Sequence, residues 1–434
     1  MRAKSNAYFN AIGGKNMKLK KLSALAMTTA MCAATIFGCG GTSNSGKDNE
    51  TTTGASAENP IKVEMKVWTP QEDQNAGWTQ QMCEKFNEAH PEWDITFTYE
   101  TCGEDKAGEM VTADPTEAAD VYMFSNDQLG TLLNADAIAK LGGEAATYVK
   151  ETNSELMVST VTKDGNIYGI PFTANTWFMY YDKSVFGEDD IKSLDAMLEK
   201  GKVAYQFGTG WYFGAFYAAG GATFCGADGS DEAAGIVLGD KGAEVTKYLV
   251  NLVKNPNFVK DDQGSGIAGL RDGSVKAIFS GSWDYATVKE ILGDNLGIAQ
   301  LPTINIGGEE GQLKAFAGSK ALGVNPNTKN MEVAVALAKF LASEEAQLAH
   351  YEMRNIVPCH TALLESEAIK NDPLAQAQAN TVANTAVIQP TNASFNTNFW
   401  NNATNMSNWI LDGTVTLDNA AEKTTELENA WNGR

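Results

Sequence analysis

The alternation of strand-like and helix-like segments over residues 61–124 limits the possible folds most strongly. IKVEMKVW (61–68) has apolar residues at every second position, which is the period of a strand. WDITFTYE (93–100) and DVYMF (120–124) predict two more strands. Helix-like segments at 75–90 and 104–112 separate the three strands. A β-α-β-α-β order predicts an open parallel sheet with helices on its faces.

Similar segments continue along the chain. Further strands are predicted at 165–173, 202–208, 275–281, 296–304 and 320–326. Further helices are predicted at 243–255, 331–353, 401–413 and 416–431. A chain of 434 residues is too long for one ordinary core, so two domains are expected. The sequence therefore predicts an α/β protein with more than one core.

The N-terminus reads as an export signal. Met17 is followed by three lysines and then by the apolar run LSALAMTTAMCAATIFG, which ends at Cys39. The last four residues, IFGC, resemble the lipobox of bacterial lipoproteins, in which the cysteine carries the lipid. An ordinary secretory peptide with a chance cysteine is the alternative. We interpret residues 1–39 as a signal peptide with a lipobox, and residues 40–59, which contain almost no bulky apolar side chain, as a flexible linker.

The charge of the chain excludes some partners. Residues 1–38 contain six basic and no acidic residues, so the rest of the chain has 27 basic and 54 acidic residues. Nucleic acid is a poor partner for such an excess of negative charge. No apolar run after the signal peptide approaches the roughly 20 residues that a membrane-spanning helix needs. We expect the body of the protein to lie outside the cell, held at the membrane through the lipid on Cys39.

Motifs of catalysis and of metal binding are missing from the sequence. It contains no Walker A motif, no HExxH and no GxSxG, and it has only three histidines. The four cysteines of the body are widely spaced; Cys83 and Cys102 could form a bridge, but buried free thiols are the preferred interpretation. A carboxylate pair for glycoside hydrolysis among 54 acidic residues remains the minority alternative. We therefore predict no catalytic residue, no metal and no cofactor.

Aromatic residues beside short polar residues stand where predicted strands end. In open α/β sheets, ligands bind beyond the carboxyl ends of the strands. An aromatic face stacks on the apolar C–H face of a sugar ring while polar neighbours bind the hydroxyl groups. Residues in such positions include Trp68, Phe124, Trp177, Trp211, Tyr212, Trp283, Tyr285 and Trp400. Core packing is the alternative for each, and it is preferred for Trp78, Trp93 and Trp431.

Four segments carry a resemblance to a known family. ADVYMFSNDQLGTLLNADAIAKL (119–141), GNIYGIPFTANTWFMYYDKSVF (165–186), AIFSGSWDYA (277–286) and NPNTKNMEVAVALAKFLASEEAQ (325–347) occur in the family's order. From about residue 61 to its end, the chain resembles the extracellular solute-binding proteins of ATP-binding-cassette sugar importers. The resemblance is strongest to the maltose/maltodextrin-binding branch, family 1.

This resemblance implies a two-lobed periplasmic-binding-protein type II fold, the Venus-flytrap fold, with crossing hinge strands. The N-terminal lobe is expected to comprise residues 60–172 and 318–366, and the C-terminal lobe residues 173–317 and 367–434. In this family the two lobes close on the ligand by a hinge motion.

The resemblance also implies ligand-binding residues. Phe124 and Asp127 would contact sugar in the first lobe, with Glu72 or Asp73 beside them. Asn175 stands where maltose binders have a glutamate, so hydrogen bonding is kept without the charge. Trp211 or Tyr212, Trp283 and Trp400 would be the stacking platforms of the second lobe. Phe124 replaces a tryptophan and Gln128 replaces an arginine, which puts the length and linkage of the preferred glycan in doubt.

We therefore expect a lipid-anchored, monomeric binding protein on the extracellular face of the membrane. It would capture maltooligosaccharide and deliver it to the permease subunits of an importer, without making or breaking a bond. The alternatives are a binding protein for xylo- or galacto-oligosaccharides, a secreted glycoside hydrolase or lyase, and a sensor or surface adhesin.

Overall fold

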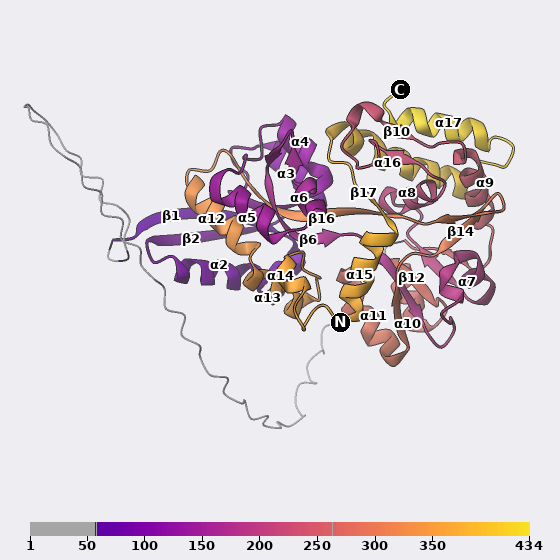
Figure 1. The fold of residues 1–434 in the computed structure, drawn as a ribbon, viewed down its shortest axis with the longest axis horizontal. Coiled ribbons are helices and arrows are strands. Elements are labelled where there is room, and N and C mark those ends of the chain that lie inside the picture. Colours follow the sequence, from indigo (N-terminus) through magenta and orange to yellow (C-terminus); the bar gives the residue numbers. More distant parts are fainter. Residues whose placement is uncertain (1–56, 58, 263) are drawn as a thin grey trace, which may run out of the picture. The chain divides into compact units, whose positions relative to one another are not determined.

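The structure is a computed structural model that describes residue 57 and residues 59–262 and 264–434 (Figure 1). The predicted signal peptide, the lipid-attachment residue Cys39 and nearly all of the predicted linker lie outside the described residues.

The first sheet contains the strands predicted from the start of the chain. β1 (Ile61–Thr69) pairs in parallel with β2 (Trp93–Thr101) and with β3 (Val121–Ser125), which confirms the predicted parallel order. β16 (Ala315–Val324) runs antiparallel to β3 and to β6 (Gly169–Asn175), and it pairs in parallel with β17 (Ala386–Ile388). The sheet order is β17-β16-β3-β1-β2, with β6 paired to β16. The sheet is therefore mixed, because β16 enters it from a distant part of the chain.

Helices pack against this sheet and enclose a core. α2 (Trp78–Ala89) lies along the sheet beside β2, α12 (Met331–Leu341) contacts β16 and β3, and α13 (Glu344–Arg354) follows beside α2 and α14 (Thr361–Leu364) (Figure 1). Trp78, Met82 and Phe86, spaced one helical turn apart on α2, are all fully buried. This first core takes its buried residues from 63–172 and 321–346.

The second sheet has the strand order β11-β8-β12-β7-β13. The bounds are β7 (Phe178–Asp182), β8 (Val203–Tyr205), β11 (Phe258–Lys260), β12 (Ala277–Ser280) and β13 (Leu296–Ala299). β8 runs parallel to β11 and β12, whereas β7 runs antiparallel to β12 and β13. Two buried clusters form around this sheet, with residues from 177–316 and 357–431.

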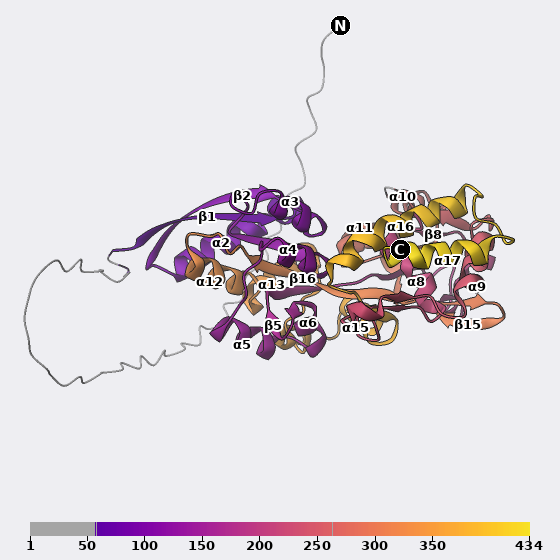
Figure 2. The same cartoon turned by 90° about the horizontal axis from the view of Figure 1, so that it is seen from above.

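Four helices form one side of the larger of these two clusters. They are α8 (Gly210–Ala219), α9 (Gly242–Leu252), α16 (Ala393–Leu411) and α17 (Ala420–Trp431). Figure 2 shows α16 and α17 side by side near α8 and α9. Phe213, Phe399 and Trp431 are buried between them.

The remaining elements lie between those already named. The helices are α1 (Gln71–Asn75), α3 (Ala107–Ala113), α4 (Leu129–Asn134), α5 (Gly143–Thr152), α6 (Glu155–Thr160), α7 (Leu194–Lys200), α10 (Ser265–Asp272), α11 (Tyr285–Leu292) and α15 (Pro373–Asn384). The strands are β4 (Thr162–Lys163), β5 (Asn166–Ile167), β9 (Thr223–Phe224), β10 (Ile236–Val237), β14 (Thr303–Ile306) and β15 (Glu309–Gln312).

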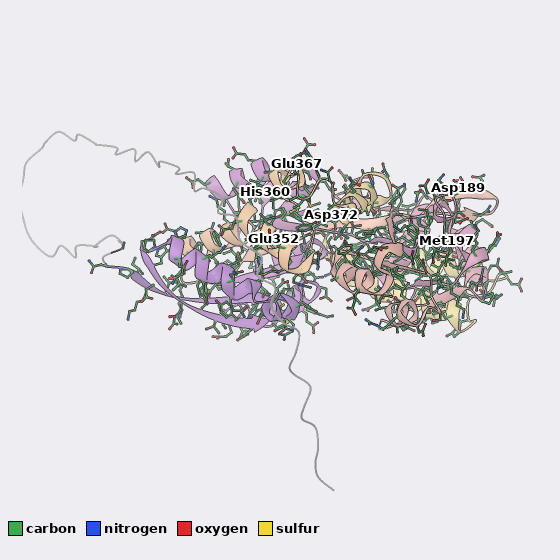
Figure 3. All side chains as sticks on the ribbon, turned by 90° about the horizontal axis from the view of Figure 1, so that it is seen from below. Asp189, Met197, Glu352, His360, Glu367 and Asp372 are labelled. Carbon is green, nitrogen blue, oxygen red and sulfur yellow. The ribbon has the colours of Figure 1, made fainter. Side chains whose placement is uncertain are left out.

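The chain passes between the first core and the other two at three places, within residues 172–177, 316–321 and 346–357. Figure 3 labels Glu352 and His360 near the third passage and Asp372 farther along, where the Asp372 side chain accepts a hydrogen bond from Leu374 N at the start of α15 (2.7 Å). None of the described helices is long and apolar enough to cross a bilayer.

Some predicted elements differ from the structure. The strand predicted at 296–304 is divided into β13 and β14, because Pro302 lies between them and a proline has no N–H to donate to a sheet. The long helix predicted at 331–353 breaks at Ala342, and Ser343 starts α13 by accepting a hydrogen bond from Ala346 N at 3.3 Å. The helix predicted from residue 401 begins earlier, at Ala393, where the Asn392 side chain caps it.

Candidate functional site

Two partly exposed tryptophan rings, on α8 and on the turn after β12, lie next to each other. The centroids of Trp211 and Trp283 are 6.0 Å apart with an angle of 31° between the ring planes. Trp283 belongs to the 3-10 turn η5 (Ser282–Asp284), and its ring folds back over Gly281. A Cβ atom at Gly281 would lie 2.1 Å from Cζ3 of Trp283, so this ring position requires glycine there. The local sequence SGSW thus places a large apolar face at the end of a buried strand.

A third partly exposed tryptophan, Trp400, lies on α16 close to the start of α8. A Cβ atom at Gly210 would be 2.9 Å from the carbonyl oxygen of Trp400, so α8 approaches α16 closely just before Trp211. The ring of Trp400 stands edge-on to Phe316, Phe395 and Phe399, at centroid distances of 5.9, 5.2 and 4.9 Å. The core therefore supports the ring while part of its surface stays open.

An ion pair lies against the Trp283 ring. Lys320 Nζ is 3.0 Å from Glu104 Oε1 and 5.6 Å from the centroid of Trp283. Glu104 comes from the 3-10 turn η1 (Glu104–Lys106) after β2, and Lys320 from the middle of β16. The sequence analysis missed both residues. A signal was available, because Lys320 is the one charged residue in the strand segment AFAGSKALGV (315–324).

Asp127 lies in the 3-10 turn η2 (Asn126–Gln128) that follows β3. Its carboxylate accepts hydrogen bonds from Ser125 Oγ (2.7 Å) and Gln128 Nε2 (2.6 Å). Burial raises the pKa of Asp127, although these two hydrogen bonds oppose the shift. Lys320 is the strand partner of Ser125, so Asp127 and the Lys320–Glu104 pair belong to one region of the molecule.

A second carboxyl group lies beside Trp283 in the sequence. Asp284 accepts a hydrogen bond from Ser280 Oγ at 2.5 Å, and burial raises the pKa of Asp284. The site thus combines open indole faces with carboxylate, ammonium and amide groups. Such a set binds an uncharged ligand that has apolar faces and many hydroxyl groups.

Two of the predicted aromatic contacts are corrected by the structure. Phe124 is fully buried in the first core, and a Cβ atom at Gly169 would be 2.9 Å from its ring. Tyr212 is buried on the inner side of α8, with its ring centroid 4.7 Å from that of Trp177. Neither ring presents an open face, because both point into a core and not toward solvent. Trp211, which faces outward, is the better choice of the pair that the sequence left open.

Asp73 is also corrected as a ligand contact. It is 1% exposed and binds His350 Nε2 at 2.7 Å and the guanidinium of Arg354. Burial alone would raise the pKa of Asp73, but its interactions with His350 and Arg354 together lower it below the ordinary value. Asp73 therefore holds α1 against α13. Glu72 beside it is exposed, and Asn175 lies buried at the end of β6, paired in register with Gly318.

A surface hollow of about 810 Å³ lies over β1 and β2, away from the tryptophans. Lys62, Glu64 and Asp94 are among its lining residues, and none of the described residues that line it is aromatic. Lys62 and Asp94 are opposite each other in register, as on an ordinary solvated sheet face. Trp211, Trp283 and Trp400, and not this hollow, are therefore the candidate site.

Among the described residues, no group of three or more histidine, cysteine or acidic side chains could hold a metal ion. Cys83, Cys102, Cys225 and Cys359 are all buried free thiols, so Cys83 and Cys102 do not pair. Of the histidines, His350 bonds to Asp73 and His90 bonds to Glu92.

The chain is similar to known proteins in sequence and in fold. The sequence profile of a family described as bacterial extracellular solute-binding protein matches residues 81–377. A galactooligosaccharide-binding protein of Bacillus subtilis (strain 168) is 27% identical over 276 residues, 59% of this chain and 64% of that relative. The maltodextrin-binding protein MdxE of the same strain is 29% identical over 270 residues, 56% of this chain and 61% of that relative. Each match thus spans less than two thirds of the relative's length.

A solved structure of a protein with acarbose is 52% identical, with a TM-score of 0.83, and the match covers 86% of this chain and 99% of that one. The predicted fold class, a two-lobed α/β fold, is confirmed by this similarity.

Proposed function

Because the chain belongs to the bacterial extracellular solute-binding protein family, we propose that it captures maltooligosaccharides for uptake by an ATP-binding-cassette importer. The observation that carries this proposal is the set of three partly exposed tryptophans, Trp211, Trp283 and Trp400, beside the Lys320–Glu104 pair. Indole faces bind the apolar faces of glucose rings, and the charged groups bind the hydroxyl groups at the rim. The maltodextrin-binding relative and the structure with acarbose support this choice of ligand.

In this proposal the ligand lies between two lobes. The lobes follow the boundaries predicted from the sequence, 60–172 with 318–366 and 173–317 with 367–434, except that the chain leaves the first core earlier at its third passage, within residues 346–357. Asp127 and Glu104 act from the first lobe, and Trp211, Trp283 and Trp400 from the second. Sugar contacts to both lobes favour the closed form by their differential affinity for it. The protein acts as a monomer, presents its closed form to the permease and makes or breaks no bond.

The location is also part of the proposal. Residues 1–39 direct export, the lipid on Cys39 holds the protein at the outer face of the membrane, and residues 40–59 act as a tether. The chemistry of IFGC and the polar composition of the segment after it support this part.

Galacto-oligosaccharide is a second candidate ligand, favoured by the galactooligosaccharide-binding relative. Stacking does not distinguish the two, because hexoses of both kinds have apolar faces.

Calorimetric titration of residues 60–434 with maltotriose, maltotetraose, galacto-oligosaccharide and xylotriose tests the assignment. We expect binding of the maltooligosaccharides at least tenfold tighter than of the other sugars. Tighter binding of galacto-oligosaccharide would select the second candidate. Chromatography of maltotetraose after prolonged incubation with the protein should show no shorter sugar, and its appearance would favour a hydrolase.

A further inference from the structure

The indole N–H groups of this protein differ in whether they have a hydrogen-bond acceptor. The described part of the chain offers no hydrogen-bond partner to the Nε1 atoms of three buried tryptophans, Trp68, Trp177 and Trp431. In contrast, two of the three partly exposed indoles of the site donate their N–H to amide side chains. Trp211 Nε1 donates to Gln389 Oε1 at 3.0 Å, and Trp400 Nε1 donates to Asn396 Oδ1 at 2.8 Å.

Gln389 is itself firmly held. It is 2% exposed. Its backbone N–H donates to Ala317 O on β16 at 2.9 Å, and its backbone carbonyl oxygen accepts from Asn126 Nδ2 at 3.2 Å. The other end of the Asn126 amide accepts from Ser319 N at 3.1 Å. The backbone of the residue whose side chain receives the Trp211 N–H is thus held between β16 and the turn after β3.

Asn396 makes an equivalent link one turn before Trp400 on α16. Its Nδ2 donates to Thr131 Oγ1 on α4 at 3.1 Å, while its Oδ1 accepts from the Trp400 indole. The same two segments also meet where Gly130 N donates to Thr391 O at 2.8 Å. A Cβ atom at Gly130 would lie 2.4 Å from Ala393 N, so the approach is close.

The hydrogen bonds of Gln389 and those of Asn396 therefore each join an indole of the site to the segment 126–131. Asp127 lies on that same 126–131 segment. An indole with a free N–H could rotate, and ordering it on binding costs free energy, which a fixed ring avoids.

We propose that Gln389 and Asn396 are positioning residues, which fix the orientation of the Trp211 and Trp400 rings relative to residues 126–131 before sugar binds. This inference rests on the proposed function, because it assigns those rings to an oligosaccharide. Neither amide has to touch the sugar, since each acts through the indole N–H that it accepts.

The test compares Gln389→Met, Asn396→Leu and Thr131→Val with wild type in calorimetric titrations with maltotriose. Losing one such hydrogen bond should raise the Kd roughly 3- to 10-fold. Asn402→Leu is the matched control, because Asn402 is an amide of the same helix whose Nδ2 donates to Asn398 O and Ala430 O, and no indole N–H of the described residues donates to it. Its Kd should stay within about twofold of wild type.

A double-mutant cycle separates positioning from a general structural role. Trp211→Phe keeps a stacking ring but removes the N–H. Adding Gln389→Met to Trp211→Phe should therefore not raise the Kd further. Near-ultraviolet circular dichroism of the unliganded protein should show a changed indole band in Gln389→Met and Asn396→Leu and an unchanged one in Asn402→Leu.

If Gln389→Met does not fold, Asn396→Leu and Thr131→Val carry the test alone. Wild-type Kd values in the folded amide variants, or an equal loss from Gln389→Met with and without the Trp211 N–H, would overturn the inference. A wild-type protein that binds no oligosaccharide would instead overturn the proposed function.

Discussion

Replacing Lys320 by methionine removes the one ammonium group at the Trp283 ring and leaves Glu104 unpaired. The side chains of Lys320 and Glu104 are 23% and 17% exposed, and their charged atoms are 3.0 Å apart. A hydrogen bond between charged groups contributes about 1.5–3 kcal/mol, and the partial exposure of both groups favours the lower end. The contact of Nζ with the ring adds about 0.5 kcal/mol at such a site. Lys320→Met should therefore lower the free energy of unfolding by about 2 kcal/mol.

The assay is urea unfolding of wild type, Lys320→Met, Glu104→Gln and the double variant, followed by circular dichroism. The double variant leaves neither charge uncompensated, so it should be more stable than the sum of the single losses predicts. Additive losses would show that the pair is not coupled and would refute the reasoning. Maltotriose titrations of the same four proteins should show weaker binding wherever Lys320 or Glu104 is changed.

Three further substitutions test separate parts of the account. Gly281→Ala places a Cβ atom 2.1 Å from the Trp283 ring, so the ring must move, and calorimetry with maltotriose should show a Kd raised roughly tenfold; an unchanged Kd would contradict the assigned ring position. Asp73→Asn leaves the partly exposed Arg354 guanidinium and the buried His350 imidazole without their carboxylate partner and should cost about 3 kcal/mol in urea unfolding at pH 7. The folded-state pKa of Asp73 is lowered from 3.8, so ionised Asp73 stabilises the fold above pH 3.8. This stabilisation is lost as pH falls through the folded-state pKa, so wild type and Asp73→Asn should converge in stability at low pH. Asp127 has the opposite sign: its folded-state pKa is raised from 3.8, so its ionisation disfavours folding as pH rises through the raised value, and Asp127→Asn should remove that part of the pH dependence.

The sequence predicted the elements whose side chains alternate or recur along one face. β1 and α2 were found in this way, because one face of each is buried and the other is not. The β3 strand was found too, but it is buried on both faces, so its pattern could not show that Phe124 points into the core. Placement of the Trp283 loop after a strand was correct, since Gly281 and its neighbours end β12.

The parts that were missed depend on contacts between distant segments. No local pattern joins Lys320 to Glu104, or Asn126 to Gln389, because β16 and residues 389–396 reach them only through the fold. The break before α13 carried a local signal, since Ser343 with two following glutamates is a typical helix start. It was overlooked because the helical spacing of the apolar residues continues across Ser343 from 331 to 353.

The central claim is that Trp211, Trp283 and Trp400 form the sugar site, and a crystal structure of residues 60–434 grown with maltotetraose tests it most directly. The account predicts glucose rings stacked on the faces of these three indoles, with hydroxyl groups within hydrogen-bond distance of Glu104 or Asp127. Sugar bound in the hollow over β1 and β2, or elsewhere with the three indole faces unoccupied, would contradict it.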